Sequence, residues 1–159
     1  MSTQTYSSIP AAGSPSHSEA WALTEAARRI AMAIERAAAA EELQIPAANR
    51  ELRDAIRLNW RLWTIFQAEL TLETNPVPMD LRQNMLTLCQ FVDNHTIVCL
   101  RDLDLNRIKT LIDINRNIAQ GLLEGLNKTL DRETNQTQSS TQPNNAAPAV
   151  SRGSLNTNA

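Results

Sequence analysis

The strongest periodic pattern of apolar residues lies between residues 49 and 72. The pattern repeats at alternating spacings of four and three, at Leu52, Ile56, Asn59, Trp63, Phe66 and Leu70. At about 100° per residue, this spacing places all six positions in one stripe along a helix. Two of the three tryptophans and one of the two phenylalanines of the chain fall in this segment. Because large aromatic side chains dominate core packing, we expect the other helices to pack on this one.

Three further stretches show the same helical periodicity. The first helix is expected to begin at Ser16, because Ser16 and Glu19 have the spacing of a capping box. It should end before Pro46, since proline lacks a backbone donor and is suited to the first turn of the next helix. The third helix is expected from about Pro78 to Arg101, after a connection that contains two prolines.

The spacing also predicts which faces of the last two helices are buried. In the third helix we expect a buried face made of Leu81, Met85, Leu88, Val92 and Cys99. Asp102 or Asp104 is expected to cap the fourth helix, because a carboxylate there can accept from the unpaired N–H groups of the first turn. The stripe of the fourth helix consists of Ile108, Leu111, Asn115, Ile118, Leu122 and Leu126.

Four helices joined by short connections predict an all-α protein with the architecture of an up-down antiparallel four-helix bundle. We assign the bundle to residues 16–131. Residues 1–15 hold Ser, Thr, Pro and Gly with isolated Tyr6 and Ile9, a composition typical of a flexible arm, which can dock through Tyr6. Residues 132–159 have the composition of a disordered, low-complexity tail.

Asn59 and Asn115 are polar residues inside otherwise apolar stripes, next to the structural aromatic residues Trp63 and Phe66. A buried polar group costs stability unless it is paired, and one use of such a group is to fix the register of packed helices. Two interpretations remain open. Each asparagine reaches a backbone carbonyl or the edge of the bundle, or the two approach one another across the second and fourth helices.

The 49–72 helix also carries residues outside its apolar stripe. Arginines lie opposite the stripe, at Arg50, Arg53, Arg57 and Arg61. The acidic residues between them make a solvated face with ion pairs the plain interpretation. Three apolar residues belong neither to the stripe nor to the arginine face: Leu58, Trp60 and Ile65. They are either covered by a neighbouring helix or form a binding surface.

Composition restricts the location and the partners of the protein. The 159 residues carry a formal net charge of −2, so the chain fits a single domain and lacks the basic character of nucleic-acid-binding domains. It contains no run of about 18 apolar residues and no secretory signal. Cys89 and Cys99, if they share one helix, lie about 15 Å apart, too far for a disulfide. We expect a cytoplasmic protein with reduced thiols and no membrane partner.

The sequence contains no recognisable catalytic constellation. His95 and Cys99 have the spacing of metal ligands on a helix, but two ligands do not make a site, and a packed, hydrogen-bonded histidine is the favoured interpretation. The chain has no glycine-rich phosphate loop, no Gly-x-Ser-x-Gly elbow and no Glu-x-x-His motif. We therefore expect a protein that is not an enzyme and that holds no cofactor and no metal.

Several segments occur in a characteristic order. Residues 61–66 read Arg-Leu-Trp-Thr-Ile-Phe, residues 75–78 read Asn-Pro-Val-Pro, and residues 111–122 read Leu-Ile-Asp-Ile-Asn-Arg-Asn-Ile-Ala-Gln-Gly-Leu. An alanine-rich first helix and the isolated Tyr6 precede them. In this order and spacing, from about residue 6 to 125, the chain resembles the FlaF family of flagellar biosynthesis regulators of alphaproteobacteria.

The resemblance implies a helical cytoplasmic protein that is required for flagellin synthesis and export. It also implies a chaperone-like role toward flagellin before secretion, alongside the regulator FlbT. We expect Leu58, Trp60 and Ile65, with Arg57 and Arg61 at the rim, to form a groove for the amphipathic terminal segments of flagellin. Two alternatives stay open: an RNA-binding regulator of flagellin messenger RNA that uses the arginine row, and a structural or homo-oligomeric adaptor.

Overall fold

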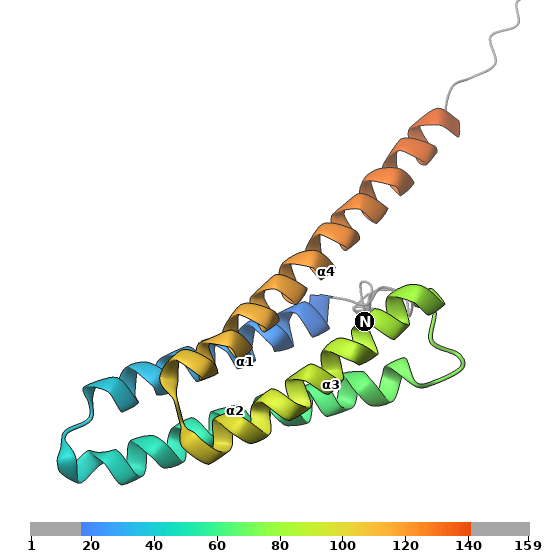
Figure 1. Ribbon diagram of the computed structural model, residues 1–159. Helices are drawn as coiled ribbons and strands as arrows, with labels where there is room; N and C mark the ends of the chain where they lie inside the picture. Colours follow the sequence, from blue (N-terminus) through green and yellow to red (C-terminus); the bar gives the residue numbers. More distant parts are fainter. Residues whose placement is uncertain (1–16, 141–159) are drawn as a thin grey trace, which may run out of the picture. The chain divides into compact units, whose positions relative to one another are not determined.

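The computed structural model describes residues 17–140, and the regular structure within this range is helical. Its elements are α1 (His17–Ala39), a short 3₁₀ helix η1 (Glu42–Gln44), α2 (Ile45–Leu70), α3 (Met79–Asp102) and α4 (Leu105–Ser140) (Figure 1). The chain divides into two compact units, Met1–Asn127 and Lys128–Ala159. The first unit contains the bundle, and the second contains the last turns of α4.

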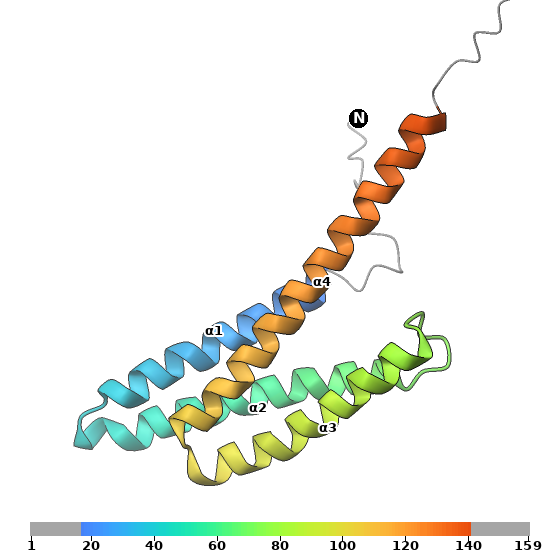
Figure 2. The ribbon, with the colours of Figure 1, turned by 45° about the horizontal axis from the view of Figure 1, so that its top comes forward.

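Within the first unit, each connection reverses the direction of the chain. Both views show α1, α2 and α3 lying side by side in alternating directions (Figures 1 and 2). The first half of α4 belongs to the same core, because its Ile108, Leu111 and Ala119 are buried together with residues of the other three helices. The predicted all-α, up-down antiparallel bundle is therefore confirmed.

Local sequence explains where the helices begin and end. Pro46 lies in the first turn of α2, where a missing N–H costs nothing. Pro78 stands immediately before α3. Leu103 ends α3 with a left-handed backbone (φ 51°), and its N–H donates to the carbonyl of Cys99 at 2.9 Å. Asp104 Oδ1 then accepts from the N–H of Arg107 at 3.0 Å, which confirms the predicted cap of α4.

The predicted stripe of α2 forms the centre of the core. Leu52, Ile56, Asn59 and Trp63 are fully buried, and Leu70 is buried near the end of the helix. Phe66 is half-buried and packs edge-on against Trp63, with ring centroids 6.0 Å apart. The other helices contribute Leu23, Ile30, Val92, Cys99, Ile108 and Leu111. The aromatic helix is thus the one on which the others pack.

Two expectations about the elements were wrong. Leu81 is 52% exposed rather than buried, because it lies in the first turn of α3, at the open end of the bundle. Helix α4 continues through Ser140 instead of ending at Asp131. No proline or glycine interrupts the chain between residues 126 and 142, so nothing local stops the helix there. The predicted arm at 1–15, Ser16 and residues 141–159 lie outside the described residues.

Candidate functional site

A buried polar cluster joins three helices at the middle of the core. Asn115 Nδ2 on α4 donates to Asn59 Oδ1 on α2 at 2.7 Å and to the carbonyl of Leu23 on α1 at 3.2 Å. The indole Nε1 of Trp63 donates to Asn115 Oδ1 at 2.9 Å. The hypothesis that the two asparagines meet across the second and fourth helices is confirmed. Because a hydrogen bond between buried groups tolerates no shift of register, this cluster fixes how α2 is rotated.

The rotation of α2 decides where the residues outside its apolar stripe lie. The residues expected to form one groove do not all lie on the same side of α2. Trp60 turns toward α3, where it is half-buried and its Nε1 donates to Asp93 Oδ1 at 2.8 Å. Leu58 and Ile65 turn toward α1 and are 40% and 49% exposed. Residues two positions apart on a helix point about 200° apart, so Leu58 and Trp60 cannot line the same groove.

The α1–α2 groove is the apolar flank of α2. It has a volume of about 280 Å³ and is lined by Trp21, Ala22, Glu25, Ala26, Arg29, Leu58, Arg61, Leu62 and Ile65. Its largest apolar side chain is Trp21, which is 68% exposed. Sequence reasoning missed Trp21, although a signal existed: Trp21 lies outside the α1 stripe of Leu23 and Ala27, just as Trp60 lies outside the α2 stripe.

Cationic side chains surround the α1–α2 groove. Glu25 Oε1 accepts from Arg28 at 2.7 Å and from Arg29 at 3.0 Å, and these hydrogen bonds lower the pKa of Glu25 to about 2. Arg61 forms no ion pair with any described residue. The single carboxylate is therefore shared between two arginines, and the rim of the groove keeps a net positive charge. Such a rim favours a partner with acidic residues beside an apolar face.

The predicted ion pairing of the arginine row is found in part. Arg57 Nη1 lies 3.5 Å from Asp54 Oδ1 on the same helix. Glu51, which stands between two members of the row, pairs with Arg36 of α1. Exposed pairs of this kind contribute little to stability, but they lower the net positive charge that the row presents to an anion.

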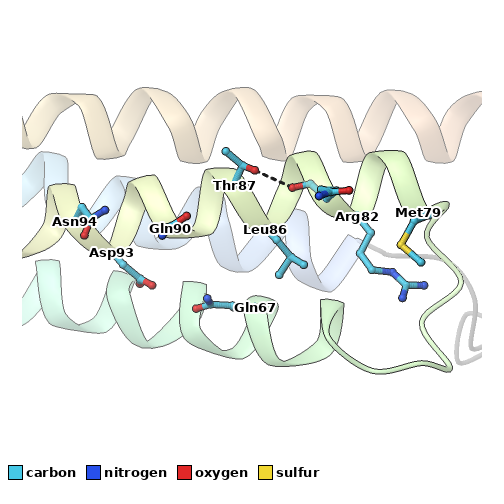
Figure 3. A pocket seen from close by; sticks show the side chains of 9 residues that line it. Gln67, Met79, Arg82, Leu86, Thr87, Gln90, Asp93 and Asn94 are labelled. Atoms are coloured by element: carbon cyan, nitrogen blue, oxygen red, sulfur yellow. Dashed lines mark hydrogen bonds between the residues drawn. The ribbon is translucent and has the colours of Figure 1, made fainter.

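The α2–α3 groove is the polar flank of α2. It is lined mainly by polar side chains, among them Gln67, Arg82, Gln83, Thr87, Gln90 and Asn94. Figure 3 shows Leu86 and Asp93 pointing from α3 toward α2, where Gln67 lies. Arg82 Nη2 donates to the carbonyls of Asn75 and Val77 at 2.8 and 3.2 Å, and so ties the α2–α3 connection to α3. The Trp60 indole therefore borders a hydrophilic surface.

A third concavity, the end pocket, lies where α1 begins and α2 ends. It has a volume of about 150 Å³. Its wall is apolar and comes from all four helices, with Leu23, Trp63, Phe66, Leu70, Leu81, Met85, Ile118 and Leu122. Glu19, Glu69, Asn75 and Val77 complete the lining. Sequence reasoning did not identify this pocket, because it forms only where four separate helix stripes meet.

Of the two residues considered for metal binding, Cys99 is buried in the core and His95 is half-buried with a hydrogen-bond partner. His95 Nε2 hydrogen-bonds the carbonyl of Arg107 at 2.8 Å, and its ring stacks on Phe91 with centroids 5.3 Å apart. Cys89 and Cys99 are reduced and buried, and burial raises the pKa of each thiol to about 11. Both thiols are therefore poor nucleophiles at neutral pH. Among residues 17–140, no three His, Cys, Asp or Glu side chains gather where they could hold a metal ion.

The sequence model of the family described as flagellar protein FlaF matches residues 2–122. The chain belongs to the FlaF family. This confirms the resemblance drawn from the residues, and it identifies the chain as a flagellar protein. No curated protein and no solved structure matches this FlaF-family chain. In the described part of the chain, no helix is both long and apolar enough to cross a membrane.

Proposed function

We propose that this FlaF-family chain is a non-enzymatic, cytoplasmic regulator of flagellum biogenesis. It binds flagellin as a chaperone-like partner in the α1–α2 groove and thereby promotes flagellin synthesis and secretion. The observation that carries the proposal is the α1–α2 groove itself, in which Trp21, Leu58 and Ile65 are left open on the surface of a flagellar protein. Exposed apolar patches with a polar rim mark interaction sites.

The chemistry of the groove fits an amphipathic segment. The terminal segments of flagellin are amphipathic and disordered before assembly, and such a segment can lay its apolar face between two helices. The floor of the α1–α2 groove is apolar, and Arg29 and Arg61 stand beside it. Acidic side chains flanking the apolar face of the client would meet these cations. Aromatic residues and arginines are the usual anchors of such interfaces.

The exposed surface is large enough to matter energetically. Trp21 is 68% exposed, and covering a tryptophan to that extent contributes about 3 kcal/mol before the cost of ordering the client. Leu58 and Ile65 add smaller areas beside it.

A titration of the purified full chain with flagellin tests the proposal. Trp21→Ala and Ile65→Glu should each weaken binding by about 2 kcal/mol or more, roughly 30-fold in Kd. Trp60→Ala is the matched control, because it removes a tryptophan from the opposite flank of α2 and should leave the affinity unchanged. If Ile65→Glu binds flagellin as tightly as the unaltered chain, the α1–α2 groove is not the flagellin site.

The same samples test the two other classes of function. Flagellin messenger RNA replaces flagellin in a titration at two salt concentrations, because RNA binding by arginines weakens steeply with salt. RNA binding that is lost in Arg50→Gln and Arg53→Gln but kept in Ile65→Glu would replace the chaperone proposal. Sedimentation of the chain alone would reveal a homo-oligomeric adaptor. If the α1–α2 groove joins two copies, Ile65→Glu should abolish this self-association.

A further inference from the structure

The end pocket is an apolar cavity whose wall reaches the surface. Leu81, at its edge, is 52% exposed, whereas Leu23 and Trp63 at its base are fully buried. An apolar wall that meets water loses the stabilisation that burial would provide. The pocket is also small, with a volume of about 150 Å³. These features suit one apolar side chain better than a whole helix.

We propose that Tyr6 of the same chain fills the end pocket. Helix α1 begins at His17, and Glu19 in its first turn already lines the pocket. The segment that precedes α1 is therefore attached at the pocket. The chain between Tyr6 and His17 can span up to about 35 Å when extended, so reach does not limit docking.

The size and the polarity of the pocket match a tyrosine. An apolar cavity of about 150 Å³ holds one benzene ring, and the end pocket has about that volume. A buried tyrosine also needs an acceptor or donor for its hydroxyl group. Glu19, Glu69 and Asn75 place polar groups among the apolar lining residues. The phenol ring would contact the apolar wall while its hydroxyl donates to one of these side chains.

Because Tyr6 and the end pocket belong to the same chain, even a weak affinity is enough for Tyr6 to occupy the pocket. A covalent connection of this length holds the two partners at an effective concentration on the order of 1 mM. An intrinsic dissociation constant of about 1 mM then fills the pocket half of the time.

The test uses the fact that Tyr6 is the only tyrosine in the chain. Full-length protein prepared with fluorotyrosine gives one fluorine resonance, which reports on residue 6 alone. Docking should shift and broaden this resonance relative to a synthetic peptide of residues 1–16, and should protect it from a soluble paramagnetic agent. A resonance with the position, width and accessibility of the free peptide would overturn the proposal.

Two variants locate the docking site. Leu81→Glu places a charge at the edge of the pocket, at an exposed position where the fold tolerates it, and should return the resonance to the position of the free peptide. Ile97→Glu is the matched control, since Ile97 is on the same helix, is also 52% exposed and does not line the pocket. If both variants leave the docked resonance in place, or both release it, Tyr6 does not occupy the end pocket.

Two further measurements distinguish docking within one chain from docking between two copies, and the end pocket from the α1–α2 groove. A resonance that moves with protein concentration would assign the docking to a second copy and would overturn the intramolecular proposal. Ile65→Glu, which should abolish flagellin binding in the α1–α2 groove, should leave the fluorine resonance docked. Release of Tyr6 by Ile65→Glu would contradict the assignment of the two surfaces to different occupants, whatever the flagellin affinity of that variant.

Discussion

The two flanks of α2 carry similar side chains with different surroundings. On the α3 side, Trp60 is half-buried and its indole nitrogen is paired with Asp93. On the α1 side, Leu58 and Ile65 remain 40% and 49% exposed beside the still more exposed Trp21. The two flanks therefore differ in whether a neighbouring helix supplies a partner and covers the apolar surface.

This difference shows how a large apolar residue outside the core stripe should be interpreted. A tryptophan is amphipathic, because its ring is apolar and its N–H donates a hydrogen bond. Where a carboxylate lies opposite, as Asp93 does for Trp60, the residue contributes to the bundle. Where no such partner is found, as in the α1–α2 groove, the residue is available to another molecule. Substitutions in the buried polar cluster and in each flank should therefore have different effects on stability and on binding.

The largest effect is expected for Asn115→Leu. This change removes three hydrogen bonds and leaves Trp63 Nε1 and Asn59 Oδ1 buried without their partner, which should lower the free energy of unfolding by about 3 kcal/mol or more. Urea unfolding measures the loss. Asn117→Leu, at an exposed position of the same helix, is the control and should change stability by less than about 0.5 kcal/mol.

Asn59→Leu should cost less than Asn115→Leu. Asn59 Nδ2 has no hydrogen-bond partner among the described residues, and Asn115 keeps its bond to the carbonyl of Leu23 when Asn59 is replaced. The double variant should lose less unfolding free energy than the two single variants lose together, and the difference should be about 1 kcal/mol or more. Additive losses would mean that the two asparagines do not interact, and the cluster would not fix the rotation of α2.

Trp60→Ala and Trp21→Ala should have opposite consequences. Trp60 packs between α2 and α3, so its removal should lower the free energy of unfolding by about 2 kcal/mol without changing the affinity for flagellin. Trp21→Ala should leave unfolding within about 0.5 kcal/mol of the unaltered chain and weaken flagellin binding. Urea unfolding and flagellin titration of both variants measure the pattern. Equal loss of affinity in both variants would remove the distinction between the flanks.

Asp93→Ala should have a smaller effect on the same flank. It leaves the half-buried Trp60 Nε1 without its acceptor, which should cost about 1 kcal/mol of unfolding free energy. Asp93→Asn keeps an acceptor oxygen and should cost less. In a Trp60→Phe background the loss from Asp93→Ala should nearly vanish, because phenylalanine has no N–H. A loss that persists in that background would show that Asp93 acts through some other contact.

The smallest effect is expected at Glu25, beside the α1–α2 groove. Hydrogen bonds from Arg28 and Arg29 lower its pKa to about 2 in the folded chain, below the value of about 4.3 in an unfolded one. Its contribution to stability is therefore present above a pH of about 4.3 and is lost as the pH falls toward 2. Glu25→Gln should flatten the pH dependence of stability slightly in this range. A pH dependence identical to that of the unaltered chain would show that the arginines do not hold the Glu25 carboxylate.

Much of the bundle is predictable from the sequence, and the reason is that helix periodicity is local. The α2 stripe from Leu52 to Leu70, the position of Pro46 and the cap at Asp104 each depend on neighbours within a few turns. The meeting of Asn59 and Asn115 was one of two interpretations that the sequence left open, and the hydrogen bond between them decides for it. Leu81 was misjudged, since its place in the stripe does not reveal that α3 begins at the open end of the bundle.

The candidate site was predictable only in part. Leu58 and Ile65 were identified by their departure from the stripe, and they do line the α1–α2 groove with Arg61. Trp60 was identified by the same signal but lies on the opposite flank. The end pocket required the ends of four stripes to be brought together.

The sequence alone determined the helices, most of their apolar faces and the polar positions Asn59 and Asn115 within those faces, because these follow from spacing along one chain. Only the tertiary structure decided which off-stripe residues are covered and which stay open. That outcome depends on what a different helix presents: Asp93 comes opposite Trp60, whereas the flank toward α1 leaves Trp21 and Ile65 exposed. Contacts between residues far apart in the chain are not contained in the period of any single helix.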